Sequence, residues 1–268
     1  MKLSNLFRPA AYIQKYKKIK DEHARYVSIN KYNNDLPALI KEQEDIFLSL
    51  GLDYKKAKDN AEYIIKNEQG FTLHKELYSE HWTIFAALDQ SKIHRILEIG
   101  TFNGEFAKYL SILFPAAEIV TVDLCDDDPL FINSYKRQDE IFREKFIEHR
   151  TRMLSARNIK FIQTNSFFLP SMNLGKFDCV WVDACHEYPE VAWDTYTAWH
   201  LCNDEGWIFC DDIYLSDTPP KGNTNDSRDA LLALKKCHIC DVNFIIKRFS
   251  PEFSADPNKR KHIGILRK

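Results

Sequence analysis

The hydrophobic pattern along the chain changes its period once, close to residue 90. Before that point apolar residues recur at the spacing of one helix face, and Gly51 stands where a helix is expected to end. The spacing predicts helices over residues 12–20, 36–50, 54–65 and 77–88. We therefore expect residues 1–90 to form a helical N-terminal extension.

From Arg95 onward, short apolar runs alternate with helical patterns. The runs cover residues 96–99, 119–122, 159–162, 180–182 and 207–210. Strands that alternate with helices form a parallel sheet wound by right-handed crossovers. Two later apolar runs, 244–246 and 262–266, are expected to close the sheet as a hairpin. The pattern predicts an α/β fold of the Rossmann-like type, with seven mostly parallel strands and helices on both faces.

The composition adds limits on location and partners. A net charge of -2 gives no global reason to expect nucleic-acid binding. Hydrophobic residues make up 44% of the chain, as in a soluble globular protein, and no apolar run approaches the length of a membrane span. The first residues lack the apolar core of a signal peptide, so we expect a cytoplasmic protein.

A glycine motif follows the first predicted strand. The strand carries Glu98 near its end and is followed by Gly100, Thr101 and then Gly104. Gly100 lets the backbone turn sharply beside a ligand, and Gly104 lets the next helix start pack tightly. The spacing differs from the G-x-G-x-x-G of dinucleotide-binding proteins. An acid before the first glycine suits a ligand with a cationic amino group.

The next two strands also end in polar residues. Asp123 ends the second strand, 19 residues after Gly104, where a carboxylate can accept hydrogen bonds from ribose hydroxyls. Asn165 and Ser166 follow the third strand, where their side chains are expected to contact an adenine edge. The simpler alternative is a plain Rossmann-like turn with an acid that caps the helix.

A second polar group follows the fourth and fifth strands. Asp183 ends the fourth strand, and Asp211 and Asp212 end the fifth. Neighbouring strands would bring these three carboxylates to one rim, where uncompensated charges repel. A bound divalent cation would remove that repulsion, and oxygen ligands suit Mg²⁺ or Mn²⁺. His186 lies three residues beyond Asp183, near enough to accept a proton from a substrate hydroxyl.

The glycine motif, with Asp123 after the second strand, resembles the class I S-adenosylmethionine-dependent methyltransferases. The resemblance covers roughly residues 95–268, so residues 91–268 are expected to form the methyltransferase domain. It implies that S-adenosylmethionine is the cofactor, with its ribose held by Asp123. The other cofactor-binding residues that it implies are Glu98, Gly100, Thr101, Gly104, Asn165 and Ser166.

The stretch from Asp183 to Tyr188 resembles a narrower family, the metal-dependent O-methyltransferases that act on sugars of macrolides. Its pattern is Asp-x-x-His-x-Tyr after one strand and a paired Asp-Asp after the next. The resemblance implies that Asp183, Asp211 and Asp212 bind Mg²⁺ or Mn²⁺. It implies that His186 is the general base, with Asp183 as the second catalytic residue.

Other interpretations of the same residues stay open. Asp183 and Asp211 would also serve as caps of local turns, and His186 as a structural histidine. The alternative functions are a metal-independent N-methyltransferase, a nicotinamide-dependent oxidoreductase and a binding protein without catalysis. The expected partner is a small-molecule or glycan acceptor, with no nucleic acid and no membrane span. The sequence leaves a homo-oligomer open.

Overall fold

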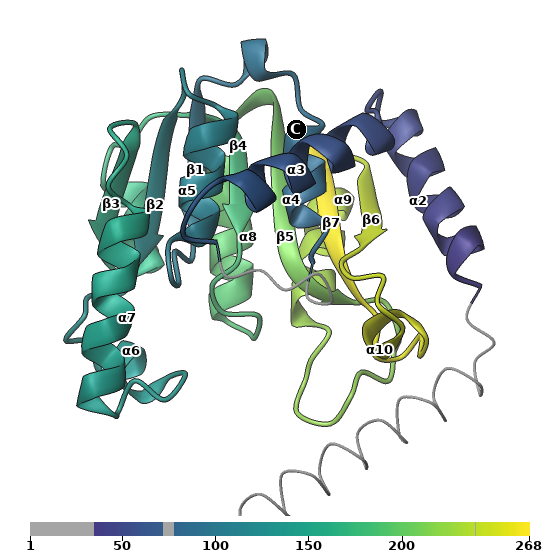
Figure 1. The fold of residues 1–268 in the computed structure, drawn as a ribbon. Coiled ribbons are helices and arrows are strands. Elements are labelled where there is room, and N and C mark those ends of the chain that lie inside the picture. Colours follow the sequence, from purple (N-terminus) through teal and green to yellow (C-terminus); the bar gives the residue numbers. More distant parts are fainter. Residues whose placement is uncertain (1–34, 72–77, 239) are drawn as a thin grey trace, which may run out of the picture.

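The computed structural model describes residues 35–71, 78–238 and 240–268, so the helix expected over residues 12–20 lies outside the described residues (Figure 1). Seven strands form one sheet in the order β3-β2-β1-β4-β5-β7-β6. They are β1 Arg95–Ile99, β2 Glu118–Asp123, β3 Ile159–Gln163, β4 Phe177–Val182, β5 Cys202–Tyr214, β6 Val242–Ile246 and β7 Lys261–Arg267. Strand β7 pairs antiparallel with both β5 and β6, and the other pairings in the sheet are parallel. The predicted Rossmann-like sheet with a closing hairpin is confirmed.

The described helices precede and connect these strands. They are α2 Leu36–Ser49, α3 Tyr54–Asn67, α4 His81–Ala86, α5 Glu105–Leu113, α6 Pro129–Asn133, α7 Glu140–Met153, α8 Glu190–Leu201, α9 Asp226–His238 and α10 Pro251–Ser254. The helices expected over residues 36–50 and 54–65 are confirmed as α2 and α3. Asp35 and Asp53 cap them by accepting from backbone N–H groups of the first turn, at 3.1 and 3.0 Å. The helix expected over residues 77–88 is shorter than predicted and appears as α4.

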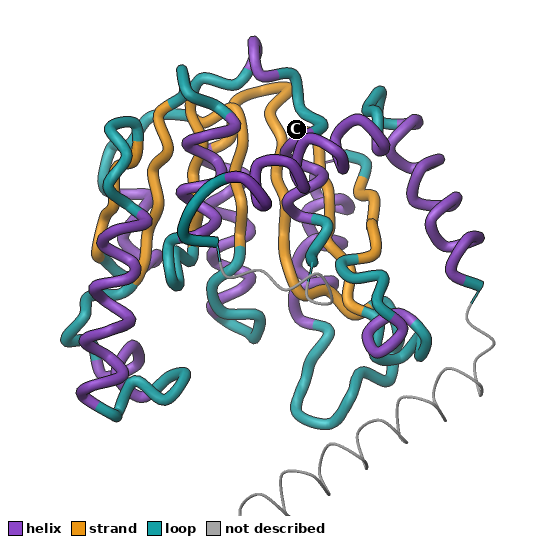
Figure 2. Tube along the Cα trace, viewed as in Figure 1, coloured by secondary structure: helices purple, strands orange, loops and turns teal. Residues whose placement is uncertain are grey.

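The alternation of side chains along the strands divides the core into two layers. In β1, Ile96 packs on one face of the sheet and Leu97 on the other; in β4, Trp181 and Val180 divide in the same way. Helices α3, α4 and α5 cover the first face, and α8 and α9 cover the second (Figures 1 and 2). The near-continuous apolar runs read from the sequence follow from this burial on both faces.

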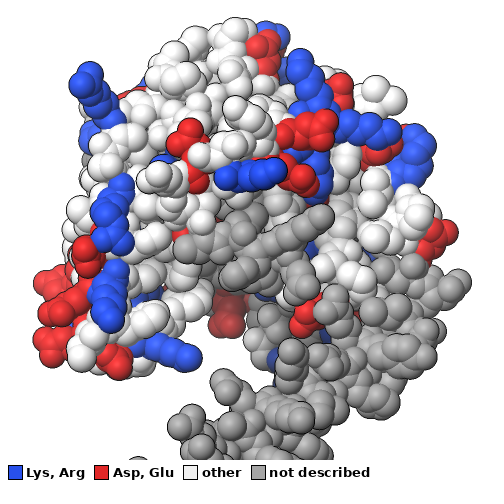
Figure 3. All heavy atoms as spheres, in the orientation of Figure 1, with Lys and Arg blue, Asp and Glu red and all other residues white. Residues whose placement is uncertain are grey.

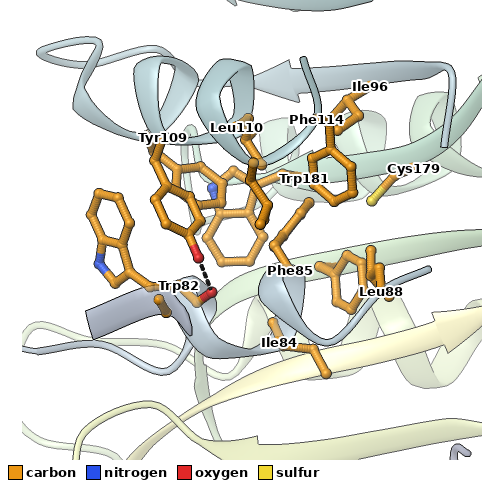
Figure 4. Packing of buried hydrophobic residues seen from close by; sticks show 14 of the residues in the cluster. Trp82, Ile84, Phe85, Leu88, Ile96, Tyr109, Leu110, Phe114, Cys179 and Trp181 are labelled. Atoms are coloured by element: carbon orange, nitrogen blue, oxygen red, sulfur yellow. Dashed lines mark hydrogen bonds between the residues drawn. The ribbon is translucent and has the colours of Figure 1, made fainter. Parts of the chain in front are cut away.

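The N-terminal helices share the core of the first face with the sheet. Trp82 and Phe85 of α4 pack with Phe106 and Tyr109 of α5 and with Trp181 of β4 (Figure 4). The Tyr109 hydroxyl donates to the carbonyl oxygen of Trp82 at 2.6 Å. The extension therefore completes the hydrophobic layer over the sheet, while the predicted boundary near residue 90 stays a prediction.

Charged side chains of both signs are interspersed over the described part of the face in Figure 3, in keeping with the small net charge of -2. Among the described helices, none has the length and apolar character needed to cross a membrane.

Gly100 connects the loop after β1 to the loop after β4. Its N–H donates to Val122 and the N–H of Asp183 donates to Ile99, both at 2.9 Å, which continues the sheet ladder by one residue on each side. Gly100 has a φ of 106°, and a Cβ there would overlap the backbone carbonyl of Asp183. The close approach of these two loops therefore requires glycine.

We expect Gly100→Ala to destabilise the protein through both the positive φ and the overlap with Asp183. The loss should be about 2–4 kcal/mol in chemical denaturation, the sum of a left-handed backbone cost and of overpacking. Gly222→Ala is the matched control, because Gly222 also has a positive φ, of 84°, but nothing lies within 4 Å of its added Cβ. It should lose only about 1–2 kcal/mol. Equal losses in the two variants would show that the loops tolerate separation.

Candidate active site

The predicted site residues gather at the carboxyl edge of the parallel strands. Asp123 is the last residue of β2, Asp183 follows β4, and Asp211 and Asp212 lie in β5. Strands β2, β1, β4 and β5 are consecutive neighbours in the sheet, so their carboxyl ends meet at one edge. This edge points downward in Figure 1, whereas the C-terminus, at the end of β7, lies at the opposite edge.

Glu98 and Thr101 form the floor of the glycine loop. The Thr121 hydroxyl, on the neighbouring strand, donates to Glu98, and the hydroxyls of Thr101 and Thr121 lie 2.6 Å apart. Glu98 is fully buried, and burial raises the pKa of its carboxyl group above its ordinary value. A cationic amino group beside this carboxyl group would favour its ionised form, as the predicted cofactor contact requires.

Asp123 anchors the glycine loop from the adjacent strand. One carboxylate oxygen accepts from the N–H of Phe102 at 2.8 Å, and the other accepts from the N–H of Leu124 at 2.8 Å. Each carboxylate oxygen has two lone pairs, so both oxygens can accept further hydrogen bonds. Asp123 therefore lies beside the glycine loop with acceptor capacity left, and its contact with ribose stays a prediction.

Two buried arginines lie near Asp123. Arg150 pairs with Asp126 at 2.5 Å, and the guanidinium of Arg137 lies 3.9 Å from the ring centre of Phe131. Burial raises the pKa of Asp123, and the charges of Arg150 and Arg137 offset part of that rise. These arginines stabilise the carboxylate form in which Asp123 accepts hydrogen bonds.

Tyr135 is a residue of this region that the sequence patterns did not identify. Its ring centre lies 5.2 Å from that of Phe102, a residue of the glycine loop, and both residues have a φ near 50°. Burial and then the charges of Asp183 and Asp212 raise the pKa of Tyr135. Tyr135 therefore contacts the glycine loop while most of its surface stays exposed.

Asn165 and Ser166 lie at the start of the 3₁₀ helix Ser166–Ser171, directly after β3. The Asn165 side chain accepts from the N–H of Phe167 at 3.0 Å and so caps that helix. The carbonyl of Ser166 accepts from the indole N–H of Trp193 at 3.3 Å. Both residues therefore have local structural roles, and their contact with adenine stays a prediction.

The paired aspartates lie on a β-bulge. The sequence predicted that the fifth strand ends at Asp211 and Asp212, but β5 continues through them to Tyr214. The pairing of β5 with β7 shifts register between Cys210 and Ile213, and Asp212 has a φ of 55°. A bulge of this kind re-aims side chains, and aspartate tolerates the left-handed conformation better than most residues. Asp211 and Asp212 consequently contact the same ammonium group.

Asp183, Asp211 and Asp212 form an acidic rim at the carboxyl ends of β4 and β5. Two lysines that the sequence patterns did not identify contact this rim. The Lys247 ammonium donates to both Asp211 and Asp212, the latter at 2.6 Å, and Lys261 donates to the other oxygen of Asp212. Burial alone would lower the pKa of Lys247, but Asp211 and Asp212 outweigh it and raise that pKa. The same ammonium groups hold the pKa of Asp212 below its ordinary value, although burial alone would raise it.

The predicted metal set of Asp183, Asp211 and Asp212 is not arranged around an open cation position. In the part of the chain that the structure describes, no group of three or more His, Cys, Asp or Glu side chains is placed to hold a metal ion. The physical reason is that ammonium groups engage three of the four carboxylate oxygens of the Asp pair. One oxygen, Oδ1 of Asp211, is buried without a hydrogen-bond partner. A cation that bridged the Asp pair would therefore have to displace ammonium groups from its oxygens.

His186 lies between two of the carboxylates. Its Nε2 is 3.5 Å from Oδ1 of Asp183 and 3.9 Å from Oδ2 of Asp212. Burial alone would lower the pKa of His186, but the contact with Asp183 outweighs it and raises the pKa. The hydroxyls of Thr224 and Ser227 both donate to the His186 carbonyl, at 3.4 Å. The loop after β5 and the start of α9 therefore help to hold the backbone of His186 at the rim.

His81 is a second histidine at the rim, contributed by the N-terminal extension. Its ring stacks on Trp181, two residues before Asp183, with the ring centres 5.4 Å apart, and its Nδ1 lies 2.7 Å from the Ser79 hydroxyl. Burial and the nearby Lys247 lower the pKa of His81 to about 3, so the ring is neutral at physiological pH. The sequence pattern identified the helix but held no signal for this residue.

The comparisons with known proteins agree with this geometry. Residues 97–213 match the family model described as a methyltransferase domain, a span that runs from β1 into β5 and includes the glycine loop and the acidic rim. No curated protein matches the sequence.

Solved structures share the fold at low sequence identity. Cofactor-bound Rv0187 from MTB is 16% identical, with 79% of this chain and 88% of that chain covered and a TM-score of 0.51. A putative O-methyltransferase from Klebsiella pneumoniae is 11% identical, with 79% and 89% covered and a TM-score of 0.50. At these identities the likeness establishes the fold. The domain match supports the methyltransferase prediction for residues 97–213.

We expect Asp123→Ala to weaken S-adenosylmethionine binding by at least about tenfold, because charge-assisted hydrogen bonds to ribose are lost. Isothermal titration calorimetry measures the change. Asp127→Ala is the control, since Asp127 is an exposed acid four residues further along the chain. Unchanged affinity of the Asp123 variant, with the control also unchanged, would remove Asp123 from the cofactor site.

Proposed function

We propose that this protein transfers a methyl group from S-adenosylmethionine to a hydroxyl group of a small molecule or glycan, with His186 as the general base. The observation that carries the proposal is the position of His186, whose Nε2 lies between Asp183 and Asp212 at the sheet edge that also holds the glycine loop. Gly100 brings that loop against the backbone of Asp183, so the cofactor cradle and the base are adjacent.

The residues of the cradle fit the proposed cofactor. Asp123 retains acceptor capacity for the ribose, and the buried carboxyl group of Glu98 suits the cationic amino group. When bound, S-adenosylmethionine supplies an electrophilic methyl group on a sulfonium, which is already a good leaving group. The protein must therefore mainly align the acceptor oxygen and remove its proton.

The rim residues provide for that proton. The acceptor hydroxyl loses its proton to an imidazole nitrogen of His186 as its oxygen forms the new bond to carbon, and the electrons of the broken carbon–sulfur bond remain on sulfur. Asp183 and Asp212 stabilise the resulting imidazolium, since both carboxylates lie within 4 Å of its Nε2. No step of this mechanism passes through a metal ion, because ammonium groups contact Asp211 and Asp212, two of the three predicted metal ligands.

The proposal of an oxygen acceptor, and of a sugar among the possible oxygen acceptors, is based on the Asp-x-x-His-x-Tyr and Asp-Asp sequence patterns. A metal-independent N-methyltransferase is the second candidate, favoured by the lysines on the Asp pair. The two candidates differ in their products: a panel of hydroxyl and amine acceptors with labelled S-adenosylmethionine separates them directly.

We expect His186→Ala to lower turnover by about 10²–10⁴, the usual contribution of a general base, while S-adenosylmethionine affinity stays unchanged. Turnover is measured on the hydroxyl acceptor that the panel identifies, and affinity by calorimetry. His94→Ala serves as the control, because His94 is an exposed histidine that precedes β1 at the opposite edge of the sheet. Normal turnover of the His186 variant would mean that another group accepts the proton.

A further inference from the structure

The Lys247 ammonium occupies the place at which a divalent cation would neutralise the rim. It donates to one oxygen of Asp211 and one of Asp212, and Lys261 donates to the second oxygen of Asp212. A cation bridging the same carboxylates would have to displace both ammonium groups, or lie beside them and be repelled. The two lysines thus supply two positive charges to a rim with three acidic side chains.

The backbone of Lys247 is held on both sides, so this contact is part of the fold. Its N–H donates to the carbonyl of Lys261 at 2.9 Å, which extends the β6–β7 ladder by one residue. Its carbonyl accepts from the N–H of Glu80 at 2.8 Å, at the start of α4. Only 7% of the Lys247 side chain is exposed, so the ammonium has no solvent position to which it could withdraw without breaking buried contacts.

The effect of Lys247 reaches the base through Asp212. Asp212 contacts Lys247 and Lys261 and also lies 3.9 Å from Nε2 of His186. Asp212 lies in the bulge of β5, and the ammonium groups of Lys247 and Lys261 hold its two carboxylate oxygens. Lys247 therefore acts on the imidazole indirectly, by holding the carboxylate that faces it.

We infer that Lys247, assisted by Lys261, is a built-in counter-cation that replaces a divalent metal at the rim and positions Asp212 against His186. The inference rests on the proposed function and deepens it. Methyl transfer then runs without a divalent cation. The acceptor needs only one hydroxyl group, because it does not have to chelate a metal ion through a second oxygen.

The test uses Mn²⁺ itself as the probe, on the full chain, followed by electron paramagnetic resonance. The wild-type protein should bind no stoichiometric Mn²⁺ at millimolar concentration, and its methyl transfer should be unaffected by a chelator. Lys247→Met removes the ammonium that bridges the two aspartates and leaves Lys261 as the one lysine on the pair, so it should gain a Mn²⁺ site at least about tenfold tighter than any wild-type binding. Lys247→Arg keeps a cation and should gain none.

Lys58→Met is the matched control. Lys58 also pairs with a buried carboxylate, Glu80, at 2.5 Å, but in the described structure it contacts a single acid. This variant should gain no Mn²⁺ site. Should Lys247→Met fail to fold, as judged by circular dichroism, Lys261→Met replaces it, because Lys261 is more exposed and frees one oxygen of Asp212.

A wild-type protein that binds one Mn²⁺, loses that ion on Asp212→Asn and loses activity with a chelator would overturn the inference. Failure of the lysine variants to gain Mn²⁺, with the fold intact, would also count against it. Calorimetry with S-adenosylmethionine separates these results from failure of the proposed function. If the wild-type protein binds both the cofactor and Mn²⁺, only the counter-cation inference fails. If it does not bind the cofactor, the proposed methyltransferase function fails, whatever the result with Mn²⁺.

Discussion

The ion pairs between Lys247 and the two aspartates of β5 join three parts of the molecule. Lys247 directly follows β6, Asp211 and Asp212 lie in the bulge of β5, and the Lys247 carbonyl accepts a hydrogen bond at the start of α4. Burying these charges is tolerable only because they neutralise one another at hydrogen-bond distance. Loss of one partner would leave a buried charge uncompensated, so the hairpin, the bulge and helix α4 depend on the same contact.

This contact also determines what the acidic rim does chemically. Carboxylates gathered at one sheet edge can serve as metal ligands, as proton acceptors or as supports for an imidazole. With ammonium groups on Asp211 and Asp212, the remaining interactions of Asp183 and Asp212 are directed toward His186. In the proposed reaction the acidic rim supports the histidine that removes the proton of the acceptor, and methyl transfer needs little more than alignment and proton removal.

Much of the fold was predictable because its signal is local. Apolar runs separated by helical patterns specify the parallel strands, and Gly100, Glu98 and Asp123 stand at fixed places relative to those strands. The carboxylates of the rim followed for the same reason, since each ends or lies in a strand of known neighbours. The length of β5 was wrong because a bulge has no apolar signature: Asp211 and Asp212 interrupt the pattern without ending the strand.

The lysines and His81 could not be predicted because their partners are remote in sequence. Lys247 lies 36 residues from Asp211 and reaches it only because β7 folds back between β5 and β6. The hairpin itself was expected, but a lysine at the end of a strand ordinarily signals solvent. His81 likewise reaches Trp181 across 100 positions of the chain, through packing of an N-terminal helix that has no pattern pointing to this edge.

The hydrogen bond from the Glu80 N–H to the Lys247 carbonyl has a consequence for how the chain folds and can be divided. Glu80 is itself buried and paired with Lys58 of α3, so the helical extension holds the lysine that balances the rim. A fragment cut at the apparent edge of the Rossmann-like unit would expose the apolar face around Trp181 and release that lysine. The backbone amides of the extension and of the sheet should therefore show similar protection from hydrogen exchange, and the two parts should unfold as a single cooperative unit.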